Sequence, residues 1–180
     1  MKGMIFTEFL AYAESRHGDD FVDDMIFSAQ LPSKGIYTAV GTYEFTELVT
    51  MLATYCQLTR QGLPPVLHAF GKYLVTTFHR KWPEIFAGYS GTISLLNQVQ
   101  DHIHVEVMKL YPDAQLPHFD TISMEDDRIV MDYSSCRALA DLAIGLIEGV
   151  ADYYDERVAI TTLPIENKPL AKVRFTIELQ

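Results

Sequence analysis

The stretch FDTISMEDDRIVMDY, residues 119–133, decides the fold class, because the spacing of apolar residues changes here from helical to alternating. Apolar and polar residues alternate over 119–124 and again over 128–133, as they do in a half-buried strand. The acidic residues 125–127 between the two segments are turn formers. The stretch therefore predicts an antiparallel hairpin.

The chain after this hairpin predicts two more strands and one helix. Apolar residues recur at helical spacing from Leu139 to Val150. A strand is expected near 158–163, and residues 171–179 alternate strictly between apolar and polar. The resulting order β-β-α-β-β predicts a four-stranded antiparallel sheet with at least one packed helix.

The chain before Pro112 shows helical spacing throughout, without a linker or a repeat. The first helices are expected around Phe6 to Ala13, around Phe21 to Ile26, and around Leu48 to Cys56 after an N-cap at Thr42. A longer helix should begin at Pro64 or Pro65 and end before Pro83, and another should run from near Thr92 to Tyr111. We therefore predict an α+β fold in which residues 1–180 form a single domain, with an N-terminal helical part followed by the sheet.

Composition argues against several classes of partner. The formal charge of −10 disfavours binding to nucleic acid. No apolar run approaches the length of a membrane span, and the amino terminus lacks the pattern of a signal peptide, so we expect a cytoplasmic protein. Cys56 and Cys136 lie far apart without CxxC spacing, which indicates two reduced thiols rather than a zinc site.

Two neighbouring histidines differ in the helix face that they occupy. At about 100° per residue, His104 shares a face with the apolar residues Ile93 and Val107, whereas His102 lies with Gln98 and Glu106. His104 should therefore face the core and His102 the solvent. From this pattern alone, an inward histidine is either a hydrogen-bonded core residue or a metal ligand.

A second group of polar residues follows the predicted hairpin. Tyr133, Ser135 and Arg137 share one parity at the end of the strand, so their donors can converge on one side. Two hydroxyls and a guanidinium can bind a carboxylate. The alternative is a set of unrelated surface and capping residues, because a YxSxR pattern is short.

Taken together, these features resemble the haem nitric oxide/oxygen binding family (H-NOX), which also supplies the haem domain of soluble guanylate cyclase. The resemblance spans the whole chain. Its marks are Met1-Lys2-Gly3, Val40-Gly41-Thr42-Tyr43, Phe70-Gly71-Lys72-Tyr73, Phe86-Ala87-Gly88, His104 seven residues before Tyr111-Pro112, and Tyr133-x-Ser135-x-Arg137.

The resemblance implies a non-covalent haem b held between the helical part and the sheet. His104 would be the axial ligand of its iron, and Tyr133, Ser135 and Arg137 would hold the propionates. Pro117 would press on the macrocycle and distort it.

The resemblance also implies a distal pocket and its gas preference. Oxygen-binding members have a distal tyrosine five residues beyond the arginine, and here that position is Leu142. The matching pocket positions are all apolar: Ile5, Phe9, Leu74, Phe78, Leu142 and Leu146. Bound oxygen benefits from a hydrogen-bond donor, so we expect the ferrous protein to bind nitric oxide and carbon monoxide but not oxygen.

The family resemblance implies a nitric oxide sensor without catalytic activity. Its signal would pass to a separate histidine kinase or cyclic-di-GMP enzyme. One alternative is a haem enzyme of the peroxidase or oxygenase type, which needs distal acid-base groups that this sequence does not offer. Another is a haem-free, redox-sensing interaction module that uses Cys136.

Overall fold

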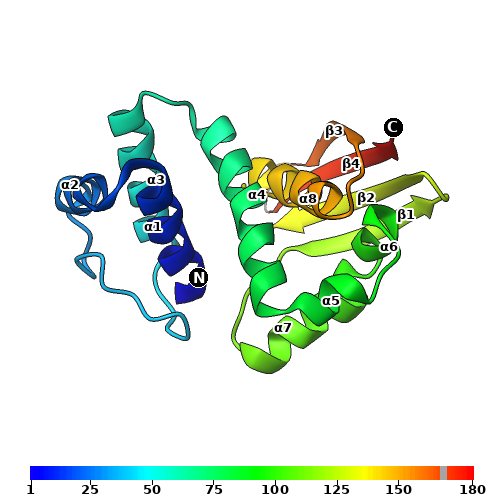
Figure 1. The fold of residues 1–180 in the computed structure, drawn as a ribbon, viewed down its shortest axis with the longest axis horizontal. Coiled ribbons are helices and arrows are strands. Elements are labelled where there is room, and N and C mark those ends of the chain that lie inside the picture. The colour runs from blue at the N-terminus through cyan, green and yellow to red at the C-terminus, as the bar shows by residue number, and fades with distance from the viewer. Residues whose placement is uncertain (167–169) are drawn as a thin grey trace. The chain divides into compact units, whose positions relative to one another are not determined.

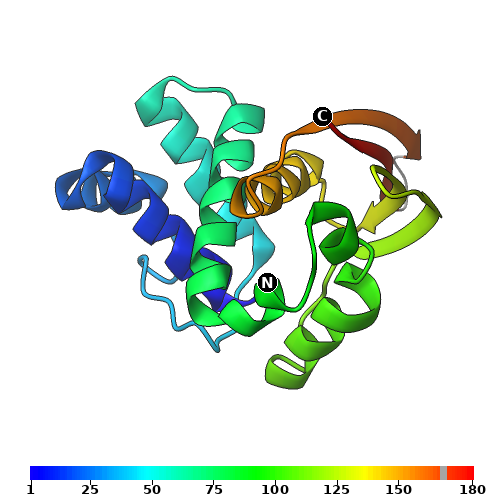
Figure 2. The ribbon, with the colours of Figure 1, turned by 45° about the vertical axis from the view of Figure 1, so that its right-hand side comes forward.

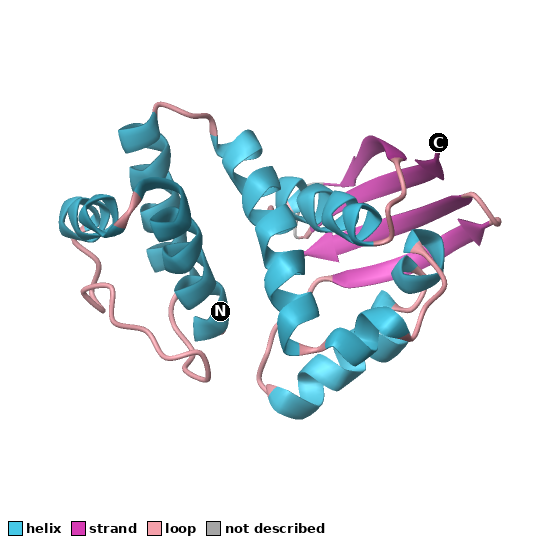
Figure 3. Cartoon of the chain, in the orientation of Figure 1, coloured by secondary structure: helices cyan, strands magenta, loops and turns pink. Residues whose placement is uncertain are grey.

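The computed structural model describes residues 1–166 and 170–180, which form two compact units. The first unit spans Met1–Val66 and the second spans Leu67–Gln180. The first consists of helices and loops, whereas the second combines helices with a sheet (Figure 3). The two units are therefore described one at a time. No helix in the described part of the chain has the length and apolar character needed to cross a membrane.

The first unit contains α1 (Gly3–His17), α2 (Asp19–Ala29) and α3 (Phe45–Thr59). These helices confirm the three that were predicted for this part of the chain. Phe9, Tyr12 and Tyr55 form the aromatic centre of this unit, with ring centroids 5.5 to 6.1 Å apart. The predicted cap is wrong, because Glu44 occupies the N-cap position of α3.

Thr42 has a different role from the one predicted. It pairs with Lys2 in an isolated antiparallel bridge, and its hydroxyl oxygen accepts a hydrogen bond of 3.0 Å from Lys2 Nζ. The amide of Gly3 also donates to the carbonyl oxygen of Gly41 at 2.8 Å. These contacts tie the start of α1 to the loop before α3, and they separate Thr42 from the helix that it was expected to cap.

The second unit confirms the predicted order of strands and helix. It holds β1 (His118–Met124), β2 (Arg128–Ser135), α8 (Ala140–Tyr153), β3 (Val158–Glu166) and β4 (Ala171–Leu179). The strands form one antiparallel sheet in the order β1-β2-β4-β3 (Figure 1). Strands β1 and β3 are therefore its edges.

Helix α8 lies between the sheet and α4 (Leu63–Lys81), as two views agree (Figures 1 and 2). On its sheet side, Ala143 and Ile147 pack with Ile129, Tyr133 and Phe175 in a buried core. On its other side, a Cβ added to Gly145 would lie 2.0 Å from the carbonyl oxygen of His68 in α4.

Gly71 of α4 also lies close to the backbone of α8. A Cβ at this position would lie 2.4 Å from the carbonyl oxygen of Leu142 in α8. The two helices can therefore approach this closely only where neither has a side chain.

One predicted helix is interrupted. In place of a helix from Thr92 to Tyr111, the chain forms α6 (Thr92–Leu96), the π-helical turn η1 (Val99–Ile103) and α7 (His104–Leu110). The amides of His102 and Ile103 both donate to the carbonyl oxygen of Gln98 at 3.0 Å. The short α5 (Pro83–Ala87), which the sequence analysis did not predict, precedes this region.

Replacement of Gly145 by alanine should destabilise the protein. The new methyl group has no room against the α4 backbone, so the helices must separate, which costs about 1–3 kcal/mol for overpacked positions. Urea denaturation measures the change in the free energy of unfolding. Gly62→Ala is the matched control, because a Cβ there would have no neighbour nearer than 3.7 Å. Equal stability of the two variants would contradict the packing argument.

Candidate functional site

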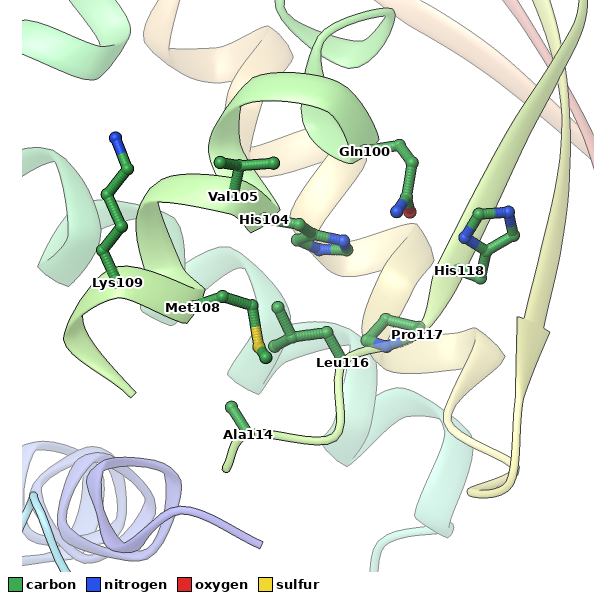
Figure 4. A pocket seen from close by; sticks show the side chains of 9 residues that line it. All are labelled: Gln100, His104, Val105, Met108, Lys109, Ala114, Leu116, Pro117 and His118. Carbon is green, nitrogen blue, oxygen red and sulfur yellow. The ribbon is translucent and has the colours of Figure 1, made fainter. Parts of the chain in front are cut away.

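A pocket of about 450 Å³ lies beside His104 in the second unit (Figure 4). Its lining comes from η1, α7, the connection that follows α7, and the start of β1. The lining residues are Gln100, His104, Val105, Met108, Lys109, Ala114, Leu116, Pro117 and His118. Two of the predicted site residues, His104 and Pro117, thus line the same cavity. The His104 imidazole and the Pro117 ring point toward the same space.

The imidazole of His104 is largely withdrawn from water. Its Nδ1 atom is buried and has no hydrogen-bond partner among the described residues. Burial, with a smaller contribution from the charge of His118, lowers the pKa of His104 from 6.5 to about 4. At neutral pH the ring is therefore uncharged, which is the form that coordinates a metal ion.

His102 takes the solvent side, as predicted. It is exposed, and the Tyr89 hydroxyl is hydrogen-bonded to its Nδ1. His118 was not singled out from the sequence, yet it lines the pocket and also pairs with Asp120 at 2.9 Å. Its position directly after Pro117 was the only signal that could have indicated this placement.

An aromatic contact connects His104 to the predicted carboxylate-binding motif. The Phe119 ring lies 5.9 Å from the His104 ring and 5.4 Å from the Tyr133 ring, measured between centroids. Tyr133 is 2% exposed, and burial raises the pKa of its hydroxyl, so this group stays protonated and can donate.

The three motif residues converge on one another. Tyr133 Oη donates to the carbonyl oxygen of Arg137 at 3.3 Å, and the amide of Arg137 donates to Ser135 Oγ at 3.0 Å. Both hydroxyl groups thus fix the backbone that carries the guanidinium. The three residues thus contact one another, and that their donors converge on one carboxylate stays a prediction.

Gln115 is a further residue of this site that the sequence analysis missed. Arg137 Nη1 donates to the Gln115 carbonyl oxygen and Arg137 Nη2 donates to Gln115 Oε1, both at 2.8 Å. Because Gln115 lies between the pocket-lining residues Ala114 and Leu116, this fork joins the motif to the pocket wall. A glutamine in a loop carries no pattern from which this contact could have been read.

The predicted distal residues are divided between the two units. Ile5 and Phe9 belong to α1, whereas Leu74 and Phe78 belong to α4 and Leu142 and Leu146 to α8. Within the second unit, Phe78 and Leu146 pack against the same buried cluster of Val75, Phe86, Leu95 and Val150. That all six residues line one pocket stays a prediction.

The site as a whole suits a flat cofactor that carries both a metal ion and carboxylates. The unpartnered, uncharged imidazole can serve as an axial ligand, and the apolar lining suits the body of such a group. The hydroxyls and the guanidinium suit its carboxylates. Cys136 is exposed beside these groups.

Comparison with protein families and solved structures gives one consistent family. Residues 2–162 match the family model described as haem-NO-binding. An H-NOX protein from K. algicida, solved as the unliganded Fe(II) A71G mutant, is 33% identical, with a TM-score of 0.93 over 100% of this chain and 97% of that chain. No match was found among curated proteins.

Two further H-NOX structures contain bound ligands. The protein from S. oneidensis in the Fe(II)NO state is 26% identical, with a TM-score of 0.91 over 100% of this chain and 99% of that one. The protein from Shewanella woodyi, in the Fe(II)CO state with IWP-051 bound, is 34% identical, with a TM-score of 0.84 over 99% and 94% of the two chains. These likenesses confirm the predicted fold class.

The lowered pKa of His104 predicts a pH dependence of stability in the ligand-free protein. Between about pH 4 and 6.5, the unfolded chain binds a proton at this histidine that the folded chain does not, so stability should fall as the solution is acidified. From pH 7.5 to 5 the loss from this group should be about 1–2 kcal/mol. Urea denaturation of the parent and of His104→Leu at pH 7.5 and pH 5 measures this loss as the difference between the two proteins in how far the free energy of unfolding falls. A His104→Leu variant with the parent's pH dependence would contradict the burial argument.

Proposed function

Because the chain belongs to the haem-NO-binding (H-NOX) family, whose domains bind haem and sense gases, we propose that it is a haem-based nitric oxide sensor. The observation that carries this proposal is the uncharged His104 imidazole, which lines a partly apolar pocket and has no hydrogen-bond partner for Nδ1 among the described residues. When bound, the haem b would supply a ferrous iron that can take a diatomic gas.

His104 is the proposed iron ligand. Its position at the first residue of α7 attaches the imidazole directly to a helix that can report a displacement. Pro117 is proposed to press on the macrocycle from the pocket wall, since its ring is rigid and faces the same cavity as His104.

Tyr133, Ser135 and Arg137 are the proposed partners of the haem propionates. Arg137 supplies a fixed positive charge, and each of its Nη atoms has a second N–H, besides the one bonded to Gln115, that can donate to a carboxylate. The hydrogen bonds from Tyr133 and to Ser135 hold the Arg137 backbone in place.

The proposed distal pocket consists of Ile5, Phe9, Leu74, Phe78, Leu142 and Leu146. None of these side chains can donate a hydrogen bond or act as an acid or base. This supports binding of nitric oxide and carbon monoxide without catalysis, since an oxygenase or peroxidase would need such groups. Gas binding by relatives from S. oneidensis and Shewanella woodyi supports the same choice of ligands.

The sensor is proposed to work as one domain over residues 1–180, in the cytoplasm, and to signal to a separate protein. A histidine kinase or a cyclic-di-GMP enzyme is the partner class suggested by stand-alone members of the family. Displacement of α7 after release of His104 would provide the signal that such a partner detects.

Haem retention should depend on His104 and not on His102. His104→Ala removes the buried ligand, so the purified variant should lose haem or require added imidazole to keep it. His102→Ala removes an exposed ring that is hydrogen-bonded to Tyr89, and it should keep the parent's ferrous absorption spectrum. Equal haem content in the two variants would refute the ligand assignment.

The gas preference follows from the missing distal donor. A hydrogen bond to a charged group contributes about 1.5–3 kcal/mol, so oxygen affinity should be about ten- to a hundredfold lower than with a donor present. The ferrous protein should therefore keep its unliganded absorption spectrum in air and change it with nitric oxide or carbon monoxide. A stable oxygen complex in air is the result that would overturn this assignment.

A further inference from the structure

The turn that precedes His104 is fastened to the exposed edge of the sheet. Strand β1 is an edge strand, so its amides that face away from β2 have no partner within the sheet. The amide of Phe119 donates instead to Gln100 Oε1 at 3.1 Å. Two residues further along the strand, Thr121 Oγ1 donates to Asn97 Oδ1 at 3.1 Å. We call these two hydrogen bonds the edge contact.

The edge contact acts on the segment whose geometry is least regular. Gln100 lies within η1, the π-helical turn that ends at Ile103, immediately before His104. Turns of this kind are rare inside helical segments and occur frequently at functional sites. The edge contact therefore holds in place the turn that leads directly into the His104 backbone.

Gln100 also belongs to the pocket itself. Its side chain lines the cavity together with His104, and both point toward the same space (Figure 4). The strand residue to which it is bonded, Phe119, contacts the His104 ring with a centroid distance of 5.9 Å. Gln100 thus fixes both the backbone that leads to His104 and the strand that carries the neighbouring ring.

We propose that Gln100, assisted by Asn97, is a positioning residue that holds His104 back from the haem iron. This inference rests on the proposed function, in which His104 is the iron ligand. With the turn docked on β1, the backbone that carries the His104 imidazole would have little freedom to move toward a bound haem. The edge contact therefore favours rupture of the bond between His104 and the iron over displacement of the helix toward the haem.

The test compares Gln100→Met with Gln98→Met. Methionine has a similar length to glutamine but offers no oxygen to the Phe119 amide. Gln98 is the matched control, because its side chain makes no hydrogen bond within residues 1–166 and 170–180. Gln100→Glu keeps the acceptor oxygen and should preserve the Phe119 hydrogen bond.

Three measurements report on different steps. Hydrogen exchange of the Phe119 amide, followed by NMR in the haem-bound protein, should accelerate at least about tenfold in Gln100→Met and stay unchanged in Gln98→Met and Gln100→Glu. Resonance Raman should show a higher iron–histidine stretching frequency in ferrous Gln100→Met, since His104 is no longer held back. The ratio of six- to five-coordinate nitric oxide complex should rise about two- to tenfold, the range for one hydrogen bond.

The outcomes separate this inference from the proposed function. A parent protein without a His104-dependent ferrous spectrum overturns the proposed function. A parent with that spectrum, but a Gln100→Met variant with an unchanged or lower stretching frequency, overturns only the positioning role. If Gln100→Met does not fold, Thr121→Val tests the second bond of the edge contact from the strand side, outside the pocket lining. The iron–histidine stretching frequency of Thr121→Val must also rise, and an unchanged frequency overturns the inference.

Discussion

The close packing of α8 on two sides is the constraint on which the second unit depends. Ala143 and Ile147 face the sheet core, and Gly145 faces α4, so one helix must satisfy both surfaces at once. Without side chains at Gly145 and Gly71, the backbones of α8 and α4 come into direct contact. The thickness of α8 therefore sets the distance from α4 to the sheet, so neither α4 nor the sheet can move toward the other.

The charges around the pocket are mostly compensated. Of the pocket-lining residues, Lys109 pairs with Glu106 at 2.6 Å and His118 pairs with Asp120 at 2.9 Å. The guanidinium of Arg137 is bonded to the amide and carbonyl oxygens of Gln115, which are neutral, and Gln115 lies beside the lining. Arg137 therefore places a positive charge beside the lining, and this charge suits an anionic ligand.

Much of the fold could be predicted from the sequence, because alternation and helical spacing are direct consequences of burial on one face. Helix α8 and the last two strands follow from such patterns, whereas β1 alternates without one-sided burial, since Ile122 and Met124 are 52% and 48% exposed. The break between α6 and α7 could not be predicted, since a π-helical turn shifts the register by one residue without altering which residues are apolar.

The contacts of Gln100 and Gln115 could not be predicted either, because the residue type of a glutamine does not indicate which group it will bond in the folded chain. The inward placement of His104 was predictable from its helix face, but its unpartnered Nδ1 was not.

The segments on both sides of α7 are hydrogen-bonded to other elements, and these bonds limit how α7 can move when His104 moves. Before the helix, the edge contact holds η1 on β1. After it, the connection to β1 is joined to Arg137 through Gln115. A helix of seven residues between two such attachments has little freedom to translate as a whole, so rotation or local unwinding of α7 is the easier response. Since Val105 and Leu110 are 47% and 59% exposed on this helix, such a response would change the apolar surface that the helix presents. The proposed iron ligand and this exposed apolar surface would then be linked by about two turns of helix.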